Sequence, residues 1–382
     1  MTEPGREVFI VAARRTAVAP RGGAFGAIEA HVLAAAPIGA VLTAAGATPD
    51  AIDGVILGNA LYGGGNPARV AALAAGLAEA MPAATIDTQC CSGLDAILAA
   101  AAEIRAGEAD LVIAGGVESF SRSPLRFRRP RAADESPQGY ERPPFTPWSD
   151  RDPDMIPAAA RLAAELAIGR GEQEAYAIDS HRKALAATGT GAEIVPLAGL
   201  ARDSFTRRLE ARLCARLPAL AGDAAHAVTA ATTAVEADAA AVVLLASATG
   251  LRRIAAAGRP LRVLAGARAG GDPERPGLAP IAAGRRVLER SAKPAATIAS
   301  AEIMEAFAVQ AIACLRGLAL DPAVVNRGGG ALARGHPIGA SGAILAVRLW
   351  HDLQGEPAGA LGLAAIAAAG GLGTALLVER SE

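Results

Sequence analysis

The sequence has little charge imbalance, few cysteines and few aromatic side chains. The first two of these argue against several classes of protein. The 382 residues carry a formal net charge of −1, which gives no electrostatic reason to expect nucleic acid or an anionic membrane as a partner. Four cysteines in a chain of this length do not make a disulfide framework. The N-terminal residues show no basic segment followed by a sustained apolar run. We therefore expect a cytoplasmic protein without a secretory signal.

Motifs for common cofactors and metals are also lacking. No strand-like segment leads into G-x-G-x-x-G or a Walker-type lysine motif. Cys90 and Cys91 are adjacent, while Cys214 and Cys314 are isolated, so no spacing suits zinc and no metal is expected. The most apolar stretch, residues 358–378, is rich in glycine. It predicts two buried strands joined by a glycine turn rather than a membrane span.

What the sequence does contain is an alternation of short β-rich runs with longer helical patterns. The short runs are apolar without polar alternation, which is typical of strands covered by helices on both faces. The predicted strands are residues 7–15, 52–61, 109–119, 259–268 and 294–303 and two strands within 361–380, and the predicted helices are residues 30–46, 67–77, 92–107 and 339–355. This pattern indicates an α/β fold.

The two ends of the chain resemble each other. Residues 92–104 are similar to residues 341–353, and the strand-like run 239–247 is similar to 373–380. Two such halves would pack their sheets around a pair of central helices, with a site between them. The alternative is a coincidental likeness between alanine-rich helices.

Between residues 119 and 226 the pattern changes to a segment rich in Pro, Arg and Asp, followed by helical runs. We interpret residues 119–226 as a loop domain inserted into an N-terminal half made of 1–118 plus 227–258, with residues 259–382 as the C-terminal half. The inserted segment carries a basic cluster that is either a solvated surface or a contact for a phosphate-bearing ligand. The cluster consists of Arg126, Arg128, Arg129 and Arg131.

Two features could carry chemistry. Cys90 and Cys91 stand where a strand-like run meets a helix, and the positive end of a helix dipole favours thiolate there. Free cysteines are also common small core residues, so residues alone leave function and packing open. His336 lies in a glycine-crowded stretch and is a natural base for a cysteine. The other histidines, His31, His181, His226 and His351, lie in helical or polar segments and are expected at the surface.

Taken together, these stretches resemble the thiolase family nearly end to end. "CCSGLDAI" is similar to C-x-S-G-L-x-A, "AGGVESFS" to G-G-x-E-S-M-S, and "EIMEAFAVQ" to E-I-N-E-A-F-A. "GGGALARGHPIGASGA" is similar to G-G-A-I-A-x-G-H-P-x-G-A-S-G, and "AAAGGLGTALLVE" lies over C-x-G-G-G-x-G. The resemblance implies a five-layered αβαβα fold of two duplicated halves with an inserted loop domain. It also implies a homodimer or homotetramer.

The resemblance further implies a set of functional residues. Cys90 would be the nucleophile that takes an acyl group from a coenzyme A thioester, which is a substrate rather than a tightly bound cofactor, and His336 would be its base. The backbone N–H groups of Cys90 and Ala369 would form an oxyanion hole. Phe307, Met304 and Ala234 would border the acyl and coenzyme A pocket.

Two positions depart from the family pattern. Met304 replaces the asparagine that holds a catalytic water, and Ala367 replaces the second cysteine, which exchanges a proton with the α-carbon or with coenzyme A. In the segment that contacts pantetheine in the family, Ala234 stands in place of a serine. The losses therefore fall on the carbon-acid half of the reaction.

Three hypotheses follow. The first is an acyltransferase that loads Cys90 and passes the acyl group to an acceptor needing no deprotonation by residue 367. Such an acceptor is an intrinsically acidic carbon, an amine, an alcohol or water. The second is an ordinary acetyl-CoA C-acetyltransferase or 3-ketoacyl-CoA thiolase with a substitute acid/base such as Cys91. The third is a non-catalytic partner subunit. The first is favoured because the Cys90 and His336 pair is retained.

Overall fold

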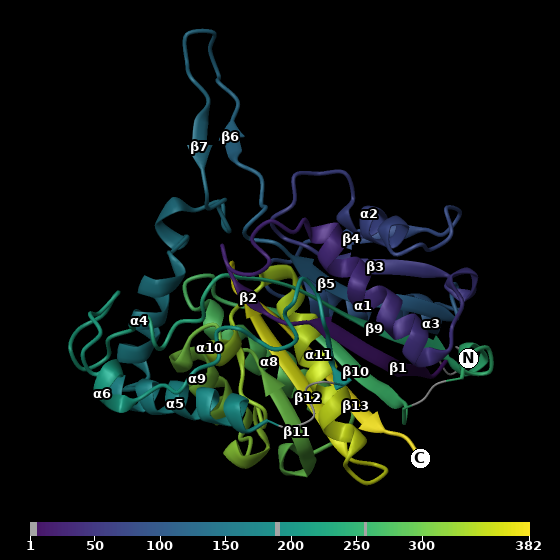
Figure 1. Cartoon of the computed structure of the whole chain (residues 1–382). Coiled ribbons are helices and arrows are strands. Elements are labelled where there is room, and N and C mark those ends of the chain that lie inside the picture. Colours follow the sequence, from purple (N-terminus) through teal and green to yellow (C-terminus); the bar gives the residue numbers. More distant parts are fainter. Residues whose placement is uncertain (1–5, 188–191, 256–257) are drawn as a thin grey trace.

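The computed structural model describes residues 6–187, 192–255 and 258–382, and one long mixed sheet runs through its centre (Figure 1). The strands of the N-terminal part are β1 (Val8–Thr16), β2 (Ala19–Pro20), β3 (Gly54–Gly58), β4 (Ala83–Ile86), β5 (Leu111–Glu118), β8 (Ile194–Val195) and β9 (Ala237–Ser247). Those of the C-terminal part are β10 (Leu261–Gly270), β11 (Ile298–Ile303), β12 (Leu361–Ala368) and β13 (Leu372–Arg380). Every strand predicted from the sequence is confirmed.

The order of strands in the sheet repeats. The path is β4-β3-β5-β9-β1 followed by β10-β13-β12-β11. In the first part β3 and β5 are parallel, while β5–β9 and β9–β1 are antiparallel. In the second part β11 and β12 are parallel, while β12–β13 and β13–β10 are antiparallel. The strand similarity of residues 239–247 and 373–380 thus corresponds to β9 and β13, which hold equivalent places.

Helices form the other layers. The main ones are α1 (Ala30–Ala45), α2 (Pro67–Ala74), α3 (Ser92–Ala106), α8 (Ala279–Arg290), α9 (Ala308–Leu318) and α11 (Ile338–Gln354). One core packs α1 and α2 on the first part of the sheet, and another packs α8 and α9 on the second. A third core, built largely from α3 and α11, lies between the two parts. These layers give the expected αβαβα arrangement.

The central helices approach each other closely because glycines face one another. A Cβ on Gly93 in α3 would lie 2.7 Å from the carbonyl oxygen of Gly339 in α11. A Cβ on Gly342 would lie 2.6 Å from the backbone nitrogen of Leu94. Side chains at these positions would push the helices apart. The starts of α3 and α11, which follow the two candidate catalytic residues, are therefore held together.

The C-terminal apolar stretch folds as predicted. It forms the antiparallel strands β12 and β13, joined at Gly370 and Gly371. Both glycines have positive φ values, 78° and 80°. Residues other than glycine rarely adopt that backbone conformation. Among the helices of the described residues, none combines the length and apolar character that crossing a membrane requires.

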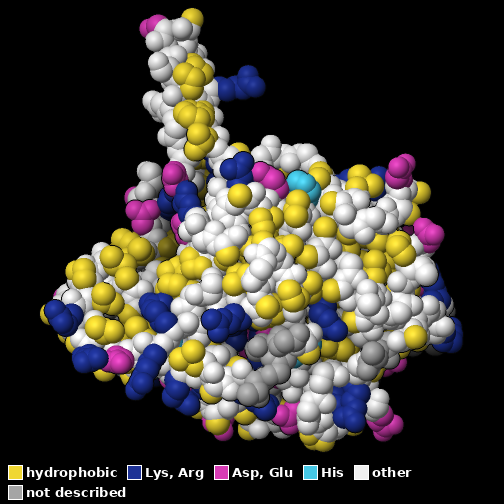
Figure 2. Space-filling model, viewed as in Figure 1, with side chains coloured by type: hydrophobic (Ala, Val, Ile, Leu, Met, Phe, Trp, Pro, Cys, Tyr) yellow, Lys and Arg dark blue, Asp and Glu magenta, His cyan; other side chains and the backbone are white. Residues whose placement is uncertain are grey.

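Between β5 and β9 the chain makes a long excursion. It contains the hairpin β6 (Arg126–Arg128) and β7 (Gln138–Tyr140), then α4 (Met155–Glu165), α5 (Arg170–Ala186), β8 and α6 (Ala211–Cys214). The short helices α7 (Ala248–Leu251) and α10 (Ala331–Arg334) follow later. The hairpin stands clear of the body, and hydrophobic side chains run along it (Figures 1 and 2). The division at residues 118, 227 and 259 into two halves and a loop domain remains our interpretation.

None of the four other histidines is fully exposed as expected: His181 is buried, and His31, His226 and His351 are half-buried. His181 is 1% exposed, and its Nδ1 accepts a hydrogen bond from the backbone N–H of Arg207 at 3.3 Å. Burial, aided by the charge of Arg207, lowers the pKa of His181 to about 4. His351 is half-buried, with its Nε2 3.2 Å from the carbonyl oxygen of Ala13. Polar neighbours in the sequence did not reveal that α5 and α11 bury these faces.

Candidate active site

Cys90 lies in a tight turn between β4 and α3. Gln89, just before it, has a φ of +55°, a conformation that costs energy for a side chain larger than glycine. The hydroxyl of Ser92 holds this turn, because it accepts from the N–H of Thr88 at 2.9 Å and donates to the carbonyl oxygen of Gln89 at 2.5 Å. The turn places Cys90 directly before the N-terminus of α3.

A buried carboxylate ties this turn to the opposite part of the sheet. Asp95 in α3 is 2% exposed and accepts from the hydroxyl of Thr88 at 2.7 Å. It also accepts from Arg268 Nε of β10 at 2.7 Å and from the Thr374 hydroxyl of β13 at 2.9 Å. The cysteine turn is therefore anchored to both halves of the fold.

His336 meets Cys90 across the central layer. It lies between α10 and α11, and its Nε2 is 3.2 Å from the Sγ of Cys90. Its Nδ1 is 2.7 Å from the hydroxyl of Ser341, and that hydroxyl lies 3.0 Å from the carbonyl oxygen of Pro337. A serine hydroxyl has one proton, which this carbonyl accepts, so its oxygen receives the Nδ1–H of the histidine. The bare Nε2 is then directed at the thiol.

The surroundings keep the resting pair neutral. Burial raises the pKa of the Cys90 thiol to about 12, although the backbone N–H groups of Ala369 and of Cys90 itself lower it. Burial lowers the pKa of His336 to about 4. The helix-dipole expectation of a standing thiolate is therefore not met, since desolvation outweighs it. A thiol next to a neutral imidazole is suited to proton transfer during attack.

A cavity of about 230 Å³ opens onto this pair. Its lining includes Cys90, His336, Ala234 and Phe307. Most of the remaining lining is apolar and comes largely from the excursion and the segments around α9, with Phe120, Phe145, Met155, Leu162, Pro276 and Ile338 as its larger members. Such an environment suits an acyl chain better than a strongly polar group.

The end of β12 forms the wall facing the pair. Ala367 and Ala369 both line the cavity. The backbone N–H groups of Ala369 and Cys90 lower the pKa of the Cys90 thiol. Ala369 does not have a positive φ, so alanine there needs no strained backbone. Two backbone N–H groups thus act on the Cys90 thiol, and such groups can stabilise the charge that develops on the carbonyl oxygen of a thioester attacked by this sulfur.

Met304 is not where the sequence placed it. It is not among the residues that line the cavity; it is 1% exposed and belongs to the core between the two parts of the sheet. The residue follows β11, and its N–H donates to the carbonyl oxygen of Ala365 at 2.9 Å. The expectation that Met304 borders the acyl pocket is therefore corrected, because its side chain is taken up by packing.

Cys91 points away from the cavity. It is fully buried, and its Sγ is 3.6 Å from the carbonyl oxygen of Ile366 in β12. Burial raises the pKa of this thiol above its ordinary value. Cys91 does not line the cavity. This placement makes it a core residue rather than a substitute for the thiol missing at Ala367.

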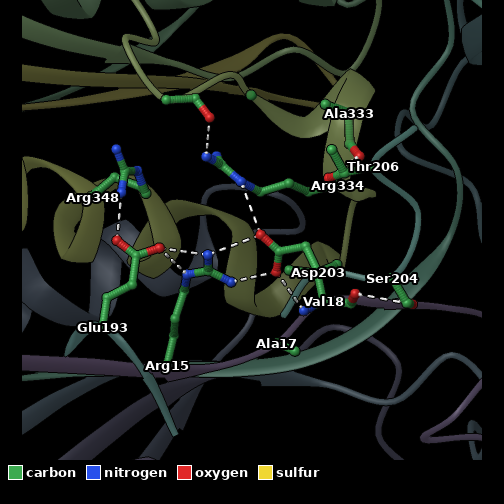
Figure 3. A network of polar contacts seen from close by, with 12 residues as sticks. Arg15, Ala17, Val18, Glu193, Asp203, Ser204, Thr206, Ala333, Arg334 and Arg348 are labelled. Atoms are coloured by element: carbon green, nitrogen blue, oxygen red, sulfur yellow. Dashed lines mark hydrogen bonds and ion pairs between the residues drawn. The ribbon is translucent and has the colours of Figure 1, made fainter. Parts of the chain in front are cut away.

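A buried ionic network holds the segment that leads to the histidine (Figure 3). The side chain of Arg15 in β1 is fully buried and donates to Glu193 and Asp203 of the excursion. Arg348 of α11 pairs with Glu193, and Arg334 of α10 pairs with Asp203 at 3.1 Å. Burial alone would raise the pKa of Glu193, but Arg15 and Arg348 lower it to about 2. The network joins the excursion to β1 and to both helices that flank the histidine.

Six predicted site residues line one cavity, and one does not. Cys90, His336, Ala234, Phe307, Ala367 and Ala369 surround it, whereas Met304 does not. Sequence reasoning missed Ser341 and Glu236, the second of which also lines the cavity. The spacing of Ser341, five residues after the histidine, could have indicated it; nothing near Glu236 does. Within the described ranges, no group of three or more His, Cys, Asp or Glu side chains could hold a metal ion.

Comparisons with known proteins by sequence and by structure point to the same family. Residues 8–249 match the model "Thiolase, N-terminal domain", and residues 260–380 match "Thiolase, C-terminal domain". An acetyl-CoA acetyltransferase of Chromobacterium violaceum is 38% identical over 397 residues, covering 98% of this chain and 100% of that protein. One of Cupriavidus necator is 37% identical over 400 residues, covering 98% and 99%. The crystal structure of the Bacillus anthracis acetyl-CoA acetyltransferase has a TM-score of 0.89 and 30% identity, covering 99% of this chain and all of that one.

Proposed function

The chain belongs to the thiolase family, and we propose that it is an acyltransferase that loads an acyl group from a coenzyme A thioester onto Cys90. The observation that carries this proposal is the 3.2 Å contact between the Cys90 sulfur and Nε2 of His336. The acetyl-CoA acetyltransferases to which the chain is similar support the choice of substrate. Coenzyme A enters as part of the substrate rather than as a bound cofactor.

The geometry supports a defined first half-reaction. The Cys90 sulfur attacks the thioester carbon while its proton moves to Nε2 of His336. The N–H groups of Cys90 and Ala369 stabilise the oxyanion that forms. When the intermediate collapses, the bond between carbon and the coenzyme A sulfur breaks. The imidazolium returns its proton to the departing thiolate, leaving free coenzyme A and an acyl-enzyme.

The second half-reaction differs from that of an ordinary thiolase. Ala367 has no proton to exchange and lies at the wall of the cavity where a thiol is expected. Met304 carries no polar group and is buried. We therefore propose an acceptor that does not need its α-carbon deprotonated there: an acidic carbon, an amine, an alcohol or water. Standard Claisen condensation or thiolysis would be slower than in an ordinary thiolase by on the order of 10²-fold or more.

Two other functions are less well supported. An ordinary acetyl-CoA C-acetyltransferase or 3-ketoacyl-CoA thiolase needs a substitute acid/base, and Cys91 is turned toward Ile366 instead of the cavity. A non-catalytic partner subunit has no evident use for a buried Cys90 and His336 pair with an oriented imidazole. The non-catalytic subunit predicts no acyl-enzyme, whereas the ordinary thiolase predicts acyl loading together with fast thiolysis of acetoacetyl-CoA.

The test is intact-protein mass spectrometry after incubation with acyl-CoAs of increasing chain length. We expect a mass increment equal to one acyl group, lost in Cys90→Ala and kept in Cys91→Ala. Cys91→Ala is the matched control because it removes a neighbouring thiol that does not face the cavity. No increment with any acyl-CoA would contradict acyl loading and favour the non-catalytic subunit.

We also propose that the chain works as a homo-oligomer, either a dimer or a tetramer. The projecting hairpin exposes Leu125 (84%) and Phe127 (58%), and an isolated two-stranded hairpin is marginally stable in water. The edge strand β4 is a second candidate contact, since edge strands offer unpaired backbone groups. Light scattering should give two or four chains per particle, and a monomer would contradict the proposal. Phe127→Ser should lower the assembly state if the hairpin takes part.

A further inference from the structure

Among the described residues that line the catalytic cavity, one carries a carboxylate: Glu236. The other groups there that can exchange a proton near neutral pH are the thiol of Cys90 and the imidazole of His336. During the second half-reaction Cys90 carries the acyl group, and His336 again has an unprotonated Nε2. The wall that would supply a second thiol holds Ala367 instead. Glu236 is therefore the one further group in the described lining, besides His336, that could accept a proton from an incoming acceptor.

The backbone places Glu236 directly beside the histidine. The N–H of His336 donates to the carbonyl oxygen of Val235 at 2.7 Å, and Glu236 and His336 pair in a parallel β-bridge. Residues paired in this way direct their side chains to the same side of the backbone. The carboxylate and the imidazole therefore project together toward the cavity that both line.

An arginine holds this carboxylate without occupying all of it. Nη1 of Arg21 donates to Oε2 of Glu236 at 2.9 Å, and the backbone N–H of Arg21 donates to the carbonyl oxygen of Glu236 at 2.9 Å. Among the described residues, no donor contacts Oε1 of Glu236. The side chain of Glu236 is 54% exposed, so an acceptor entering from solvent can reach it. The carboxylate is oriented and has an oxygen available.

We propose that Glu236 is the general base of the second half-reaction and that the acceptor reacts through an N–H or O–H group. This inference rests on the proposed function, since it requires an acyl group on Cys90. The acceptor nitrogen or oxygen forms a bond to the acyl carbon while its proton passes to Glu236. The bond between that carbon and the Cys90 sulfur then breaks, the departing thiolate takes up a proton that solvent supplies by way of His336, and Glu236 releases the acceptor's proton to solvent.

The chemistry of the proton favours this class over a carbon acceptor. A nitrogen or oxygen becomes acidic as it forms its new bond, so a carboxylate is a sufficient base. Removing a proton from the α-carbon of a thioester leaves an enolate, which needs oxyanion donors of its own. Met304 is buried and offers no such donor, whereas the N–H groups of Cys90 and Ala369 act on the Cys90 thiol and would be available to an acyl carbonyl on it. The cavity thus retains what attack by nitrogen or oxygen requires.

The test measures release of the acyl group from preformed acyl-enzyme. Wild type, Glu236→Gln and the control Glu172→Gln are loaded with acyl-CoA, freed of excess reagent and exposed to water alone, 2-phenylethanol or 2-phenylethylamine. Glu172 forms a comparable exposed pair with Arg316 outside the catalytic cavity. Hydroxylamine, which attacks thioesters without a base, is the fourth reagent. Loss of the acyl mass is followed with time.

We expect Glu236→Gln to slow release by at least one of the first three reagents about 10²-fold, while hydroxylamine releases the acyl group similarly from all three proteins. The reagent that is affected identifies water, an alcohol or an amine as the acceptor class. Equal release from wild type and Glu236→Gln, or an acyl-enzyme that none of the three reagents releases, would overturn the inference while leaving acyl loading intact. Absence of acyl-enzyme in the wild type would overturn the proposed function itself.

Discussion

The two walls of the catalytic cavity differ in how much of the family pattern they keep. One wall carries Cys90 and His336, whose Sγ and Nε2 lie 3.2 Å apart. Ser341, behind the histidine, lies 2.7 Å from Nδ1 and leaves a bare nitrogen facing the thiol. The opposite wall carries Ala367 and Ala369, which offer backbone N–H groups and methyl groups. Under the proposed function, the residues that form a thioester are retained, while the side chain for carbon-acid chemistry is absent. Acyl loading and carbon–carbon chemistry would then be separable functions of one cavity.

The largest effect on the retained wall should come from removing the base. His336→Ala should slow formation of the acyl-enzyme by about 10²- to 10⁴-fold, because the neutral thiol would have no partner for its proton. Rapid-quench mass spectrometry measures this rate. His31→Ala is a suitable control, since His31 is half-buried and does not line the cavity. An unchanged rate in His336→Ala would show that the pair does not act together.

Restoring a thiol at position 367 should restore part of the missing thiolysis activity. Ala367→Cys should raise thiolysis of acetoacetyl-CoA by about 10²-fold over the wild type, because a proton donor returns to the cavity. The matched control is Ala365→Cys, since Ala365 lies in the same strand and does not line the cavity. Equal thiolysis in wild type and Ala367→Cys would mean that another group already supplies the proton.

A smaller effect is expected from Ser341, which acts on the cavity through His336. Ser341→Ala removes the acceptor for Nδ1–H of His336. If the hydrogen bond that orients the ring stabilises the transition state by about 1.4 kcal/mol, its loss would slow acylation about tenfold. The ¹⁵N shifts of the His336 ring report the tautomer directly. They should indicate a single tautomer in the wild type and a mixture in Ser341→Ala. A slower enzyme with an unchanged tautomer would assign Ser341 a purely structural role.

The smallest effect should be that of pH on acylation. The pKa of His336 is lowered to about 4 by burial, so the imidazole stays neutral and able to accept a proton as the pH falls toward that value. Between about pH 7.5 and about pH 5 the acylation rate should change little. A histidine with the ordinary pKa of about 6.5 would lose about 30-fold over this range. Such a loss would contradict the buried, neutral base.

The fold and the central pair were predictable because they depend on local patterns. Apolar runs between glycine turns indicated the strands, and the stretches around Cys90 and His336 carry the ordered motifs of the family. Chain topology then brings these two residues together, 246 positions apart in sequence. The alanines at 367 and 369 could be placed in the cavity for the same reason.

The other positions depended on packing that no local pattern encodes. Met304 follows a strand in the structure, as the sequence predicted, yet its side chain lies in the core between the two parts of the sheet. His181 lies among polar neighbours but is buried where α5 packs against the segment that holds Phe205 and Arg207. Glu236 lies next to His336 because a β-bridge pairs these two residues, which are 100 positions apart in the sequence. Long-range pairing of this kind determines which side chains share a cavity.

The most direct measurement compares the two chemistries in one preparation of the wild-type protein. The rate of acyl-enzyme formation from acyl-CoA is measured beside the turnover of acetoacetyl-CoA in thiolysis. Acyl-enzyme should form on Cys90 with at least one acyl-CoA, while thiolysis should be slower by about 10²-fold or more, because Ala367 cannot exchange a proton. Thiolysis as fast as acyl loading would contradict the separation of the two functions.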